Sequence, residues 1–171
     1  MHHAAPPQAA VPERHFDLVS HWRIGAPVER VWAALADAET WPHWWPSVRA
    51  VHSLKNGGAD GLGSVRRIEW AARLPYGRVL EIERVEALRP ERLRARARGR
   101  RQGEGIWLLR EDVHEDPGFT HVTYVWRMHA MRPWMRWLAP LLRFSHARVM
   151  REGAAGLARH LQVPHGTADR G

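Results

Sequence analysis

The residue best suited to chemistry in this sequence is His146, which lies within the long stretch from Pro140 to Leu161. If this stretch is a helix, His146 points about 55° from the centre of its apolar stripe, toward whatever the helix covers. Imidazole titrates in the range needed for general acid or base catalysis, and it can hydrogen-bond a carbonyl or hydroxyl group of a ligand. The alternative is a core histidine that is bonded to a backbone carbonyl.

Tryptophan is the second residue type that stands out, with ten copies against three phenylalanines. Large flat side chains at this density indicate either a bulky core or an aromatic-walled cavity for a flat or lipidic ligand. The candidate lining residues are Trp44, Trp45, Trp70, Trp107, Tyr124, Trp126, Trp134, Trp137, His146, Met150 and Gly153. For any single one of them, core packing is the alternative. Tyr76 could add a hydroxyl at the mouth of the cavity, or could be a packed turn residue.

The long stretch has the pattern of an amphipathic helix with two unusual positions. Its predicted apolar stripe consists of Arg143, Ala147, Met150, Ala154, Leu157 and Leu161. Gly153 and Gly156 interrupt the helix interior, where each glycine costs about 1 kcal/mol relative to alanine. We therefore expect another part of the chain to approach the helix backbone closely there, or to need the space.

Arg66, Arg67 and Glu69 alternate along a predicted strand and could serve a ligand from inside the fold. Whichever parity the strand adopts, one charged side chain points to its inner face. A buried charge must be paired with an opposite charge or must bind a ligand. The sequence alone leaves the parity open.

Arginine occupies every second position from Arg92 to Arg100 in the run that ends at Arg101, so five arginines share one face of a predicted strand. We interpret this face as the solvated convex side of a sheet, paired across the ladder with Glu81, Glu83 and Glu86 of the preceding strand. The alternative is a surface that binds phosphates, an acidic protein or an anionic membrane, and the net charge of +8 would suit it.

Other chemistries find no matching residues in the sequence. The absence of cysteine excludes disulfides, a thiolate nucleophile and cysteine zinc sites. There is no HExxH motif or carboxylate cluster, and His114-Glu115-Asp116 falls in a predicted turn, so we expect no metal site. The GxGxxG, Walker and GxSxG patterns are also absent, and we therefore expect no cofactor.

At 171 residues the chain suits a single domain, which we expect to span residues 15–162 between a disordered leader (1–14) and a disordered tail (163–171). No stretch has the pattern of a signal peptide or a transmembrane span, so a cytoplasmic protein is the default interpretation. We expect no nucleic-acid partner and allow for a transient contact with a membrane surface. The oligomeric state is left open.

The candidate residues must be positioned by an ordered series of strands and helices. Phe16 to Ile24 alternates like a half-buried strand, and a helix that opens at Pro27 stops near Asp37. Trp41 to Val48 is a short turn of helix or an ordered loop, because its prolines forbid a long helix. The strands that follow are Val48 to Lys55, Ser64 to Leu74, Gly77 to Leu88, Arg92 to Gly99, Gly105 to His114 and Thr120 to Ala130. Arg132 to Ala139, a short amphipathic segment, leads into the long helix.

Consecutive strands joined by short turns predict an antiparallel meander with one apolar face. The C-terminal helix is the element long enough to cover that face. The predicted fold class is therefore α+β: a curved antiparallel sheet of about seven strands wrapped around the long C-terminal helix, with one or two short helices after the first strand.

This order of elements, with the opening APVERVWAALADAETWPHWWPSV, resembles the START-like helix-grip superfamily, in its polyketide cyclase/dehydrase and lipid-transport branch. Further matches to a bacterial subgroup of that branch are GLGSVRRIEWAARLPYGRVLEIERVEALRPERL, the tryptophan of EGIWLL, Tyr124-x-Trp126-Arg127, Pro133-Trp134-Met135 and FSHARVMREGAAGL. In that subgroup the helix motif reads Asn-His-Asp where this chain has Ser145-His146-Ala147, so the histidine alone matches. The resemblance covers Phe16 to Leu161.

The resemblance implies a deep hydrophobic cavity between sheet and helix, which members use to carry lipids, sterols, hormones or aromatic polyketides, and a minority to catalyse cyclisation or dehydration. We expect this chain to bind a lipidic or aromatic small molecule, with the WPHWWP loop and Trp134 to Trp137 as the gate. One alternative is a cyclase or dehydratase that uses His146 as acid or base, with Tyr76 or an inward arginine polarising a carbonyl. The other is an interaction module that binds anionic partners through the arginine face.

Overall fold

The computed structural model describes residues 15–71, 78–98, 103–113, 118–129 and 139–162. The predicted leader and tail lie outside these ranges, as do most of the amphipathic segment before the long helix and the candidate residues Tyr76, Trp134 and Trp137.

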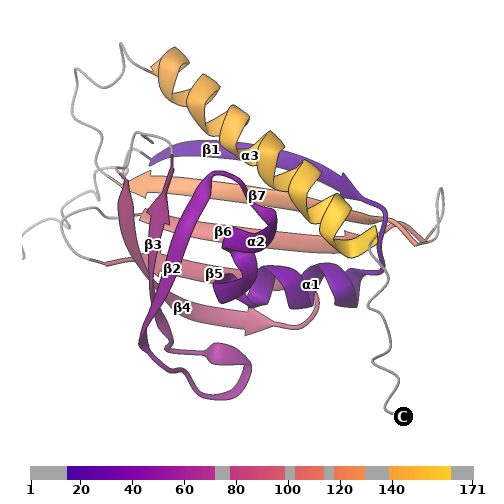
Figure 1. Cartoon of the computed structure of the whole chain (residues 1–171), viewed down its shortest axis with the longest axis horizontal. Helices are drawn as coiled ribbons and strands as arrows, with labels where there is room; N and C mark the ends of the chain where they lie inside the picture. Colours follow the sequence, from indigo (N-terminus) through magenta and orange to yellow (C-terminus); the bar gives the residue numbers. More distant parts are fainter. Residues whose placement is uncertain (1–14, 72–77, 99–102, 114–117, 130–138, 163–171) are drawn as a thin grey trace, which may run out of the picture.

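A seven-stranded antiparallel sheet forms one layer of the fold (Figure 1). Its strands are β1 (His15–Ile24), β2 (Val48–Lys55), β3 (Val65–Trp70), β4 (Val79–Leu88), β5 (Arg92–Ala97), β6 (Gly103–Glu111) and β7 (Thr120–His129). Their spatial order is β1-β7-β6-β5-β4-β3-β2, so β2 to β7 form a meander and β1 pairs with β7. The predicted meander and the number of strands are confirmed.

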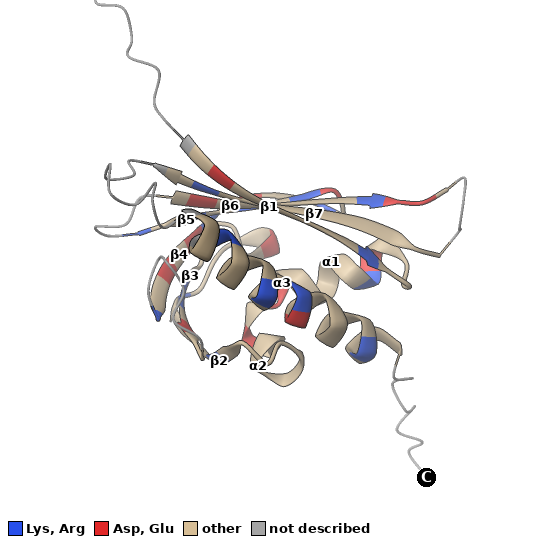
Figure 2. Cartoon of the chain, turned by 90° about the horizontal axis from the view of Figure 1, so that it is seen from above, with Lys and Arg blue, Asp and Glu red and all other residues tan. Residues whose placement is uncertain are grey.

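The helices form the second layer, and Figure 2 shows α1, α2 and α3 on the same side of the sheet. They are α1 (Val28–Ala36), the 3-10 turn η1 (Ala38–Thr40), α2 (Trp41–Trp44), the 3-10 turn η2 (Ala59–Gly61) and α3 (Ala139–Gln162). Val31, Trp32 and Leu35 form the buried face of α1. Arg30 of α1 donates to the carbonyl oxygen of Leu161 at 2.7 Å, which ties α1 to the last turn of α3.

The buried face of α3 differs from the predicted stripe in its first half. Its fully buried residues are His146, Val149, Met150, Gly153, Gly156, Leu157 and Leu161, whereas Arg143 and Ala147 are exposed. The prediction followed the apolar side chains, but α3 packs on α2 through its glycines, and this contact rotates the buried face. His146 therefore lies near the middle of that face and is 2% exposed.

The parity of β3 is settled by its neighbours. Arg66 shares the inner side with Ile68 and Trp70, both buried, and its Nε lies 3.1 Å from a carboxylate oxygen of Glu39. Arg67 pairs with Glu81 at 2.8 Å and Glu69 with His52 at 3.2 Å. The inward charge is thus Arg66.

On the outer side of the sheet, Arg92 and Arg94 of β5, and Arg98 just after it, are paired with acids of the neighbouring strands. Glu86 lies 3.3 Å from Arg92 and 3.0 Å from Arg94, and Arg94 also approaches Glu104 of β6 at 3.7 Å. Arg98 pairs with Glu83 at 3.9 Å. The predicted cross-strand pairing is confirmed for Glu83 and Glu86, whereas Glu81 pairs with an arginine of β3 instead.

Candidate functional site

Trp45, at the end of α2, is the centre of a cluster of tryptophans between the sheet and α3. Its ring centroid lies between 5.5 and 6.2 Å from those of Trp22, Trp41, Trp44, Trp70 and Trp107. These rings come from β1, α2, β3 and β6, so the curved sheet and the helical turn converge on one point. Trp22 and Trp41 were not among the predicted lining residues, although the strand alternation that buries Trp22 could have identified it.

The two glycines of α3 allow α2 to approach its backbone. The indole nitrogen of Trp45 donates to the carbonyl oxygen of Val149 at 3.0 Å. A Cβ atom at Gly153 would lie 2.5 Å from Cε2 of Trp45, and one at Gly156 would lie 1.8 Å from the carbonyl oxygen of Trp44. The expected close approach to these glycines is confirmed, and the approaching group is α2.

A cavity of about 40 Å³ remains beside this cluster. Six of the predicted lining residues meet there: Trp45, Trp70, Trp107, Tyr124, Trp126 and Met150. Trp41 and aliphatic side chains such as Ile68 and Leu80 complete its wall. Because pockets for drug-sized ligands measure about 300–1,000 Å³, the aromatic rings occupy most of the space that a ligand would need.

Among the described residues that were predicted to line the cavity, His146, Trp44 and Gly153 do not line it. The last two take other positions. Trp44 stacks on Trp45, at 5.5 Å between ring centroids, and on His160, at 6.4 Å, and it does not line the cavity. Gly153 is covered by the ring of Trp45, which occupies the space that the sequence suggested for a ligand. Both differences follow from the docking of α2 on α3, a contact between segments far apart in the sequence.

His146 lies against Tyr124 with ring centroids 6.1 Å apart and an interplanar angle of 16°. Burial lowers the pKa of His146 to about 4, so its imidazole is neutral near pH 7. Burial also raises the pKa of Tyr124, which keeps its hydroxyl protonated. Tyr124 in turn packs on Trp107 at 4.1 Å, and the pair joins His146 to the aromatic wall.

Buried indole N–H groups give the wall a polar component. Those of Trp41 and Trp70, which line the cavity, have no hydrogen-bond acceptor among the residues that the structure describes. A buried donor without an acceptor costs about 1–3 kcal/mol. A hydrogen-bond acceptor placed beside either group would recover this cost.

Arg84 is an inward residue that sequence reasoning missed. It donates to the carbonyl oxygen of Asp60 at 2.8 Å and to that of Ala36, the last residue of α1. The signal was present in the sequence, because Ile82 and Arg84 share one face of β4 and the acids Glu81 and Glu83 share the other.

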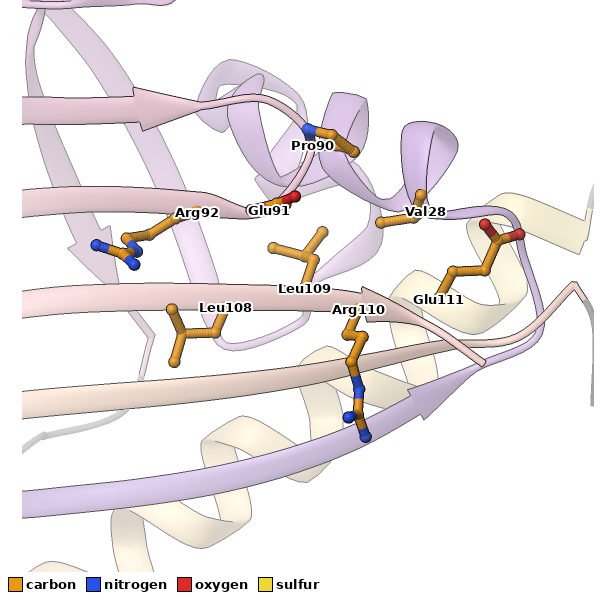
Figure 3. A pocket seen from close by; sticks show the side chains of 8 residues that line it. All are labelled: Val28, Pro90, Glu91, Arg92, Leu108, Leu109, Arg110 and Glu111. Atoms are coloured by element: carbon orange, nitrogen blue, oxygen red, sulfur yellow. The ribbon is translucent and has the colours of Figure 1, made fainter. Parts of the chain in front are cut away.

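A larger hollow of about 470 Å³ lies elsewhere, where the turn between β4 and β5 meets β6 and the start of α1. Figure 3 shows the side chains of Arg92, Leu108 and Arg110 spread along it, with Glu91 and Glu111 nearby. It is open to solvent and carries both signs of charge, which gives no selectivity for a hydrophobic molecule. The tryptophan-lined cavity is therefore the better candidate site.

The described residues contain no group of three or more His, Cys, Asp and Glu side chains that could hold a metal ion. None of the helices in the described ranges is long and apolar enough to cross a membrane.

Three solved structures share this arrangement of sheet and helices. A START superfamily protein from Mycobacterium smegmatis is 15% identical, with a TM-score of 0.65 over 86% of this chain and 97% of that one. The Zhui aromatase/cyclase from a Streptomyces species is 14% identical, with a TM-score of 0.67 over 86% and 94%. Truncated norcoclaurine synthase from Thalictrum flavum is 9% identical, with a TM-score of 0.66 over 90% and 98%. At these identities the likeness shows the fold alone.

No curated protein matches the sequence. The sequence profile of the family described as "Polyketide cyclase / dehydrase and lipid transport" matches residues 15–162, from the first strand to the end of α3. The sheet and helices share the helix-grip fold of the START superfamily protein from Mycobacterium smegmatis. The profile match means that the chain belongs to the polyketide cyclase/dehydrase and lipid-transport family.

Proposed function

We propose that this domain binds a small hydrophobic molecule, aromatic or lipidic, in the tryptophan-lined cavity beneath α3. The observation that carries the proposal is the convergent aromatic wall with the indole N–H groups of Trp41 and Trp70, which have no acceptor in the described residues. A carbonyl or ether oxygen of a ligand would accept from them, and each bond would recover about 1–3 kcal/mol of desolvation cost. Membership of a family described by cyclases, dehydrases and lipid transport supports a small-molecule ligand.

Entry of such a ligand requires the rings to move. The space left between them, about 40 Å³, is far below the volume of a two-ring aromatic molecule. The surrounding rings are held by edge-to-face contacts worth about 0.5–1.5 kcal/mol each, which is small enough for a ligand to replace. Binding would therefore exchange contacts among tryptophans for contacts with the ligand.

The proposal is tested by native mass spectrometry of the purified protein and by quenching of tryptophan fluorescence with three probes: acetonaphthone, ethylnaphthalene and palmitate. We expect quenching by at least one probe, and tighter binding of acetonaphthone than of ethylnaphthalene, because only the ketone accepts a hydrogen bond. Trp70→Phe should remove this preference, whereas Trp32→Phe, a buried tryptophan of α1 away from the cavity, should keep it. Absence of both co-purified ligand and quenching would contradict the proposal.

A second candidate function is a cyclase or dehydratase, favoured by the pairing of His146 with Tyr124. A neutral imidazole can accept a proton from carbon next to a carbonyl, and a protonated phenol can donate to that carbonyl oxygen. Tyr124 is the hydroxyl-bearing residue whose ring lies against His146 in the described structure, and Tyr76 lies outside the described residues. The test is deuterium incorporation into phenylacetone in heavy water, which His146→Ala should abolish while probe binding is kept. Incorporation that survives the substitution removes His146 from the mechanism.

The arginine face offers less support for an anionic partner than the sequence suggested. Arg92, Arg94 and Arg98 each have an acidic partner within the sheet, so little of their charge is available to a phosphate or a membrane.

A further inference from the structure

This inference rests on the proposed ligand site and concerns the chemistry of its ligand. A second crevice of about 40 Å³ adjoins the tryptophan-lined cavity. The two spaces share Trp41, Ile82, Ala95 and Trp107 in their walls, so movement of the same side chains would join them. The rest of the wall carries aromatic rings in the tryptophan-lined cavity, whereas in the crevice it carries arginines.

The crevice has a basic lining without an acidic residue. Its charged lining residues are Arg66, Arg84 and Arg94, and the remainder are apolar apart from the buried Ser64. Arg94 is compensated by Glu86 and Glu104 on the outer side of the sheet. The charges that act on the crevice are therefore those of Arg66 and Arg84.

Arg84 is held in place by neutral groups. Its two hydrogen bonds in the described structure go to the backbone carbonyls of Asp60 and Ala36, and no carboxylate of the described residues lies within ion-pair distance. Gly61, with a φ of 70°, makes room for it, because a Cβ there would lie 2.5 Å from Nη1 of Arg84. Burial and then the charge of Arg66 lower the pKa of Arg84, against smaller opposing effects of Asp37 and Asp60.

Arg66 adds a second positive charge beside it. Its Nε faces Glu39 at 3.1 Å and its Nη1 donates to the carbonyl oxygen of Lys55 at 2.7 Å. The side chain of Glu39 is 52% exposed, so water screens much of its charge. Besides the paired arginine of β5, the crevice is thus lined by two guanidinium groups and by no carboxylate of the described residues. The nearby acids Glu39, Asp37 and Asp60 act on these charges from outside the lining. A planar guanidinium in such a place is suited to a carboxylate or a phosphate, which it can bind through two parallel hydrogen bonds.

We propose that the ligand of this domain is an aromatic acid, whose ring lies in the tryptophan-lined cavity and whose anionic group lies in the adjoining crevice against Arg84 and Arg66. The aromatic part is recognised by stacking and by the indole N–H groups, and the acidic end is recognised by the guanidinium groups. This arrangement distinguishes an aromatic acid from a neutral lipid or polycyclic molecule, which would leave Arg84 with backbone carbonyls alone as its hydrogen-bond partners in the described structure.

The test compares three probes of matched shape by isothermal titration calorimetry: naphthoate, naphthyl phosphate and the neutral naphthamide. We expect the better of the two anions to bind about tenfold or more tightly than naphthamide, as charge-assisted hydrogen bonds do relative to neutral ones. The preferred anion identifies the acidic group as carboxylate or phosphate. Arg84→Gln should remove most of the preference. Arg67→Gln, which removes the same charge from the outer side of the sheet, should keep it.

Different binding results would contradict the aromatic-acid assignment and the hydrophobic ligand site. Equal binding of naphthamide and both anions would overturn the aromatic-acid assignment and leave a hydrophobic ligand site. Failure of all three probes and of acetonaphthone, in a folded protein, would contradict the site itself. If Arg84→Gln does not fold, Arg66→Gln serves as the second variant, and an unchanged preference for the anion in it would count against the inference.

Discussion

Among the single residues of the site, His146 shows how burial selects the chemistry of a side chain. Its imidazole has a pKa of about 4, lowered from 6.5 by removal from water, so it is neutral over most of the physiological range. It can therefore accept a proton or a hydrogen bond near pH 7, but at this pH it is not an imidazolium ion that could donate a proton as a general acid. The same low pKa makes the neutral imidazole a weak proton acceptor, since a general base works best when its pKa lies near the operating pH.

The same shift predicts how stability depends on pH. Between pH 6.5 and about 4 the unfolded chain binds a proton at His146 that the folded chain does not, so stability is lost as pH falls. At about 1.4 kcal/mol per pKa unit, we expect this residue to cost about 3 kcal/mol of unfolding free energy across that interval. Urea unfolding from pH 7 to pH 4 measures it.

His146→Gln should flatten this pH dependence, whereas His21→Gln, at an exposed position on β1, should not. If the wild type and His146→Gln lose stability in parallel over this range, the titration of His146 is not its cause.

A contact between one ring and one glycine makes a second prediction at the residue scale. Gly153→Ala should lower the unfolding free energy by about 1–3 kcal/mol, because its methyl group would overlap the ring of Trp45 and displace it from Val149. This steric loss exceeds the gain of about 1 kcal/mol in helix propensity. In a Trp45→Phe background the overlapping atoms are absent, and the same substitution should cost less. Additive effects of the two substitutions in denaturant unfolding would argue against the contact.

The position of a single residue could be predicted from the sequence where the alternation of its own strand determines it. It could not be predicted where a contact between distant segments determines it. Trp70, Trp107 and Trp126 lie at the cavity because strand alternation alone turns their side chains inward. Trp44 and Gly153 do not, because their surroundings are set by the docking of α2 on α3. Arg84 was not predicted as an inward residue. The alternation of β4, which places Arg84 on the same face as Ile82, is a weaker pattern than the arginine run of β5.

At the scale of elements, the decisive contact is that of α2 with α3. A Cβ at Gly156 would lie 1.8 Å from the carbonyl oxygen of Trp44, which is backbone and cannot rotate away as a side chain can. We therefore expect Gly156→Ala to destabilise the protein by about 3 kcal/mol or more, and by more than Gly153→Ala. Urea unfolding and the near-ultraviolet circular dichroism of the tryptophans are the measurements. A smaller loss for Gly156→Ala than for Gly153→Ala would show that α2 is not seated as described.

The strands and helices themselves were predictable because their apolar residues repeat with a clear strand or helix spacing. The strands and both longer helices lie where alternation and the helical repeat placed them, to within a few residues at each end. The face of α3 was the exception. Its predicted stripe included Arg143 and Ala147, which are exposed, because a helix that packs through glycines has no large side chain to mark its buried side.

For the whole molecule, one group of tryptophans both fills the core and forms the candidate site. Trp107 contacts Trp22, Trp41, Trp45 and Tyr124, and it lines both the aromatic cavity and the crevice of Arg84. This ring stabilises the closed fold. If a ligand binds in the cavity as proposed, the ring must move before the ligand can enter, and stability and ligand affinity would then be opposed at this residue.

Trp107→Leu separates the two effects. We expect it to lower the unfolding free energy by about 3 kcal/mol, as loss of a large buried side chain does, and to tighten and accelerate the binding of naphthoate, because less of the binding energy is spent on opening the cavity. Trp32→Leu removes the same volume from the core beside α1 and should lower stability similarly without changing affinity. Denaturant unfolding and stopped-flow fluorescence measure the two quantities. Weaker naphthoate binding in Trp107→Leu would instead mean that this ring holds the ligand, and the opening step would have to lie elsewhere in the aromatic wall.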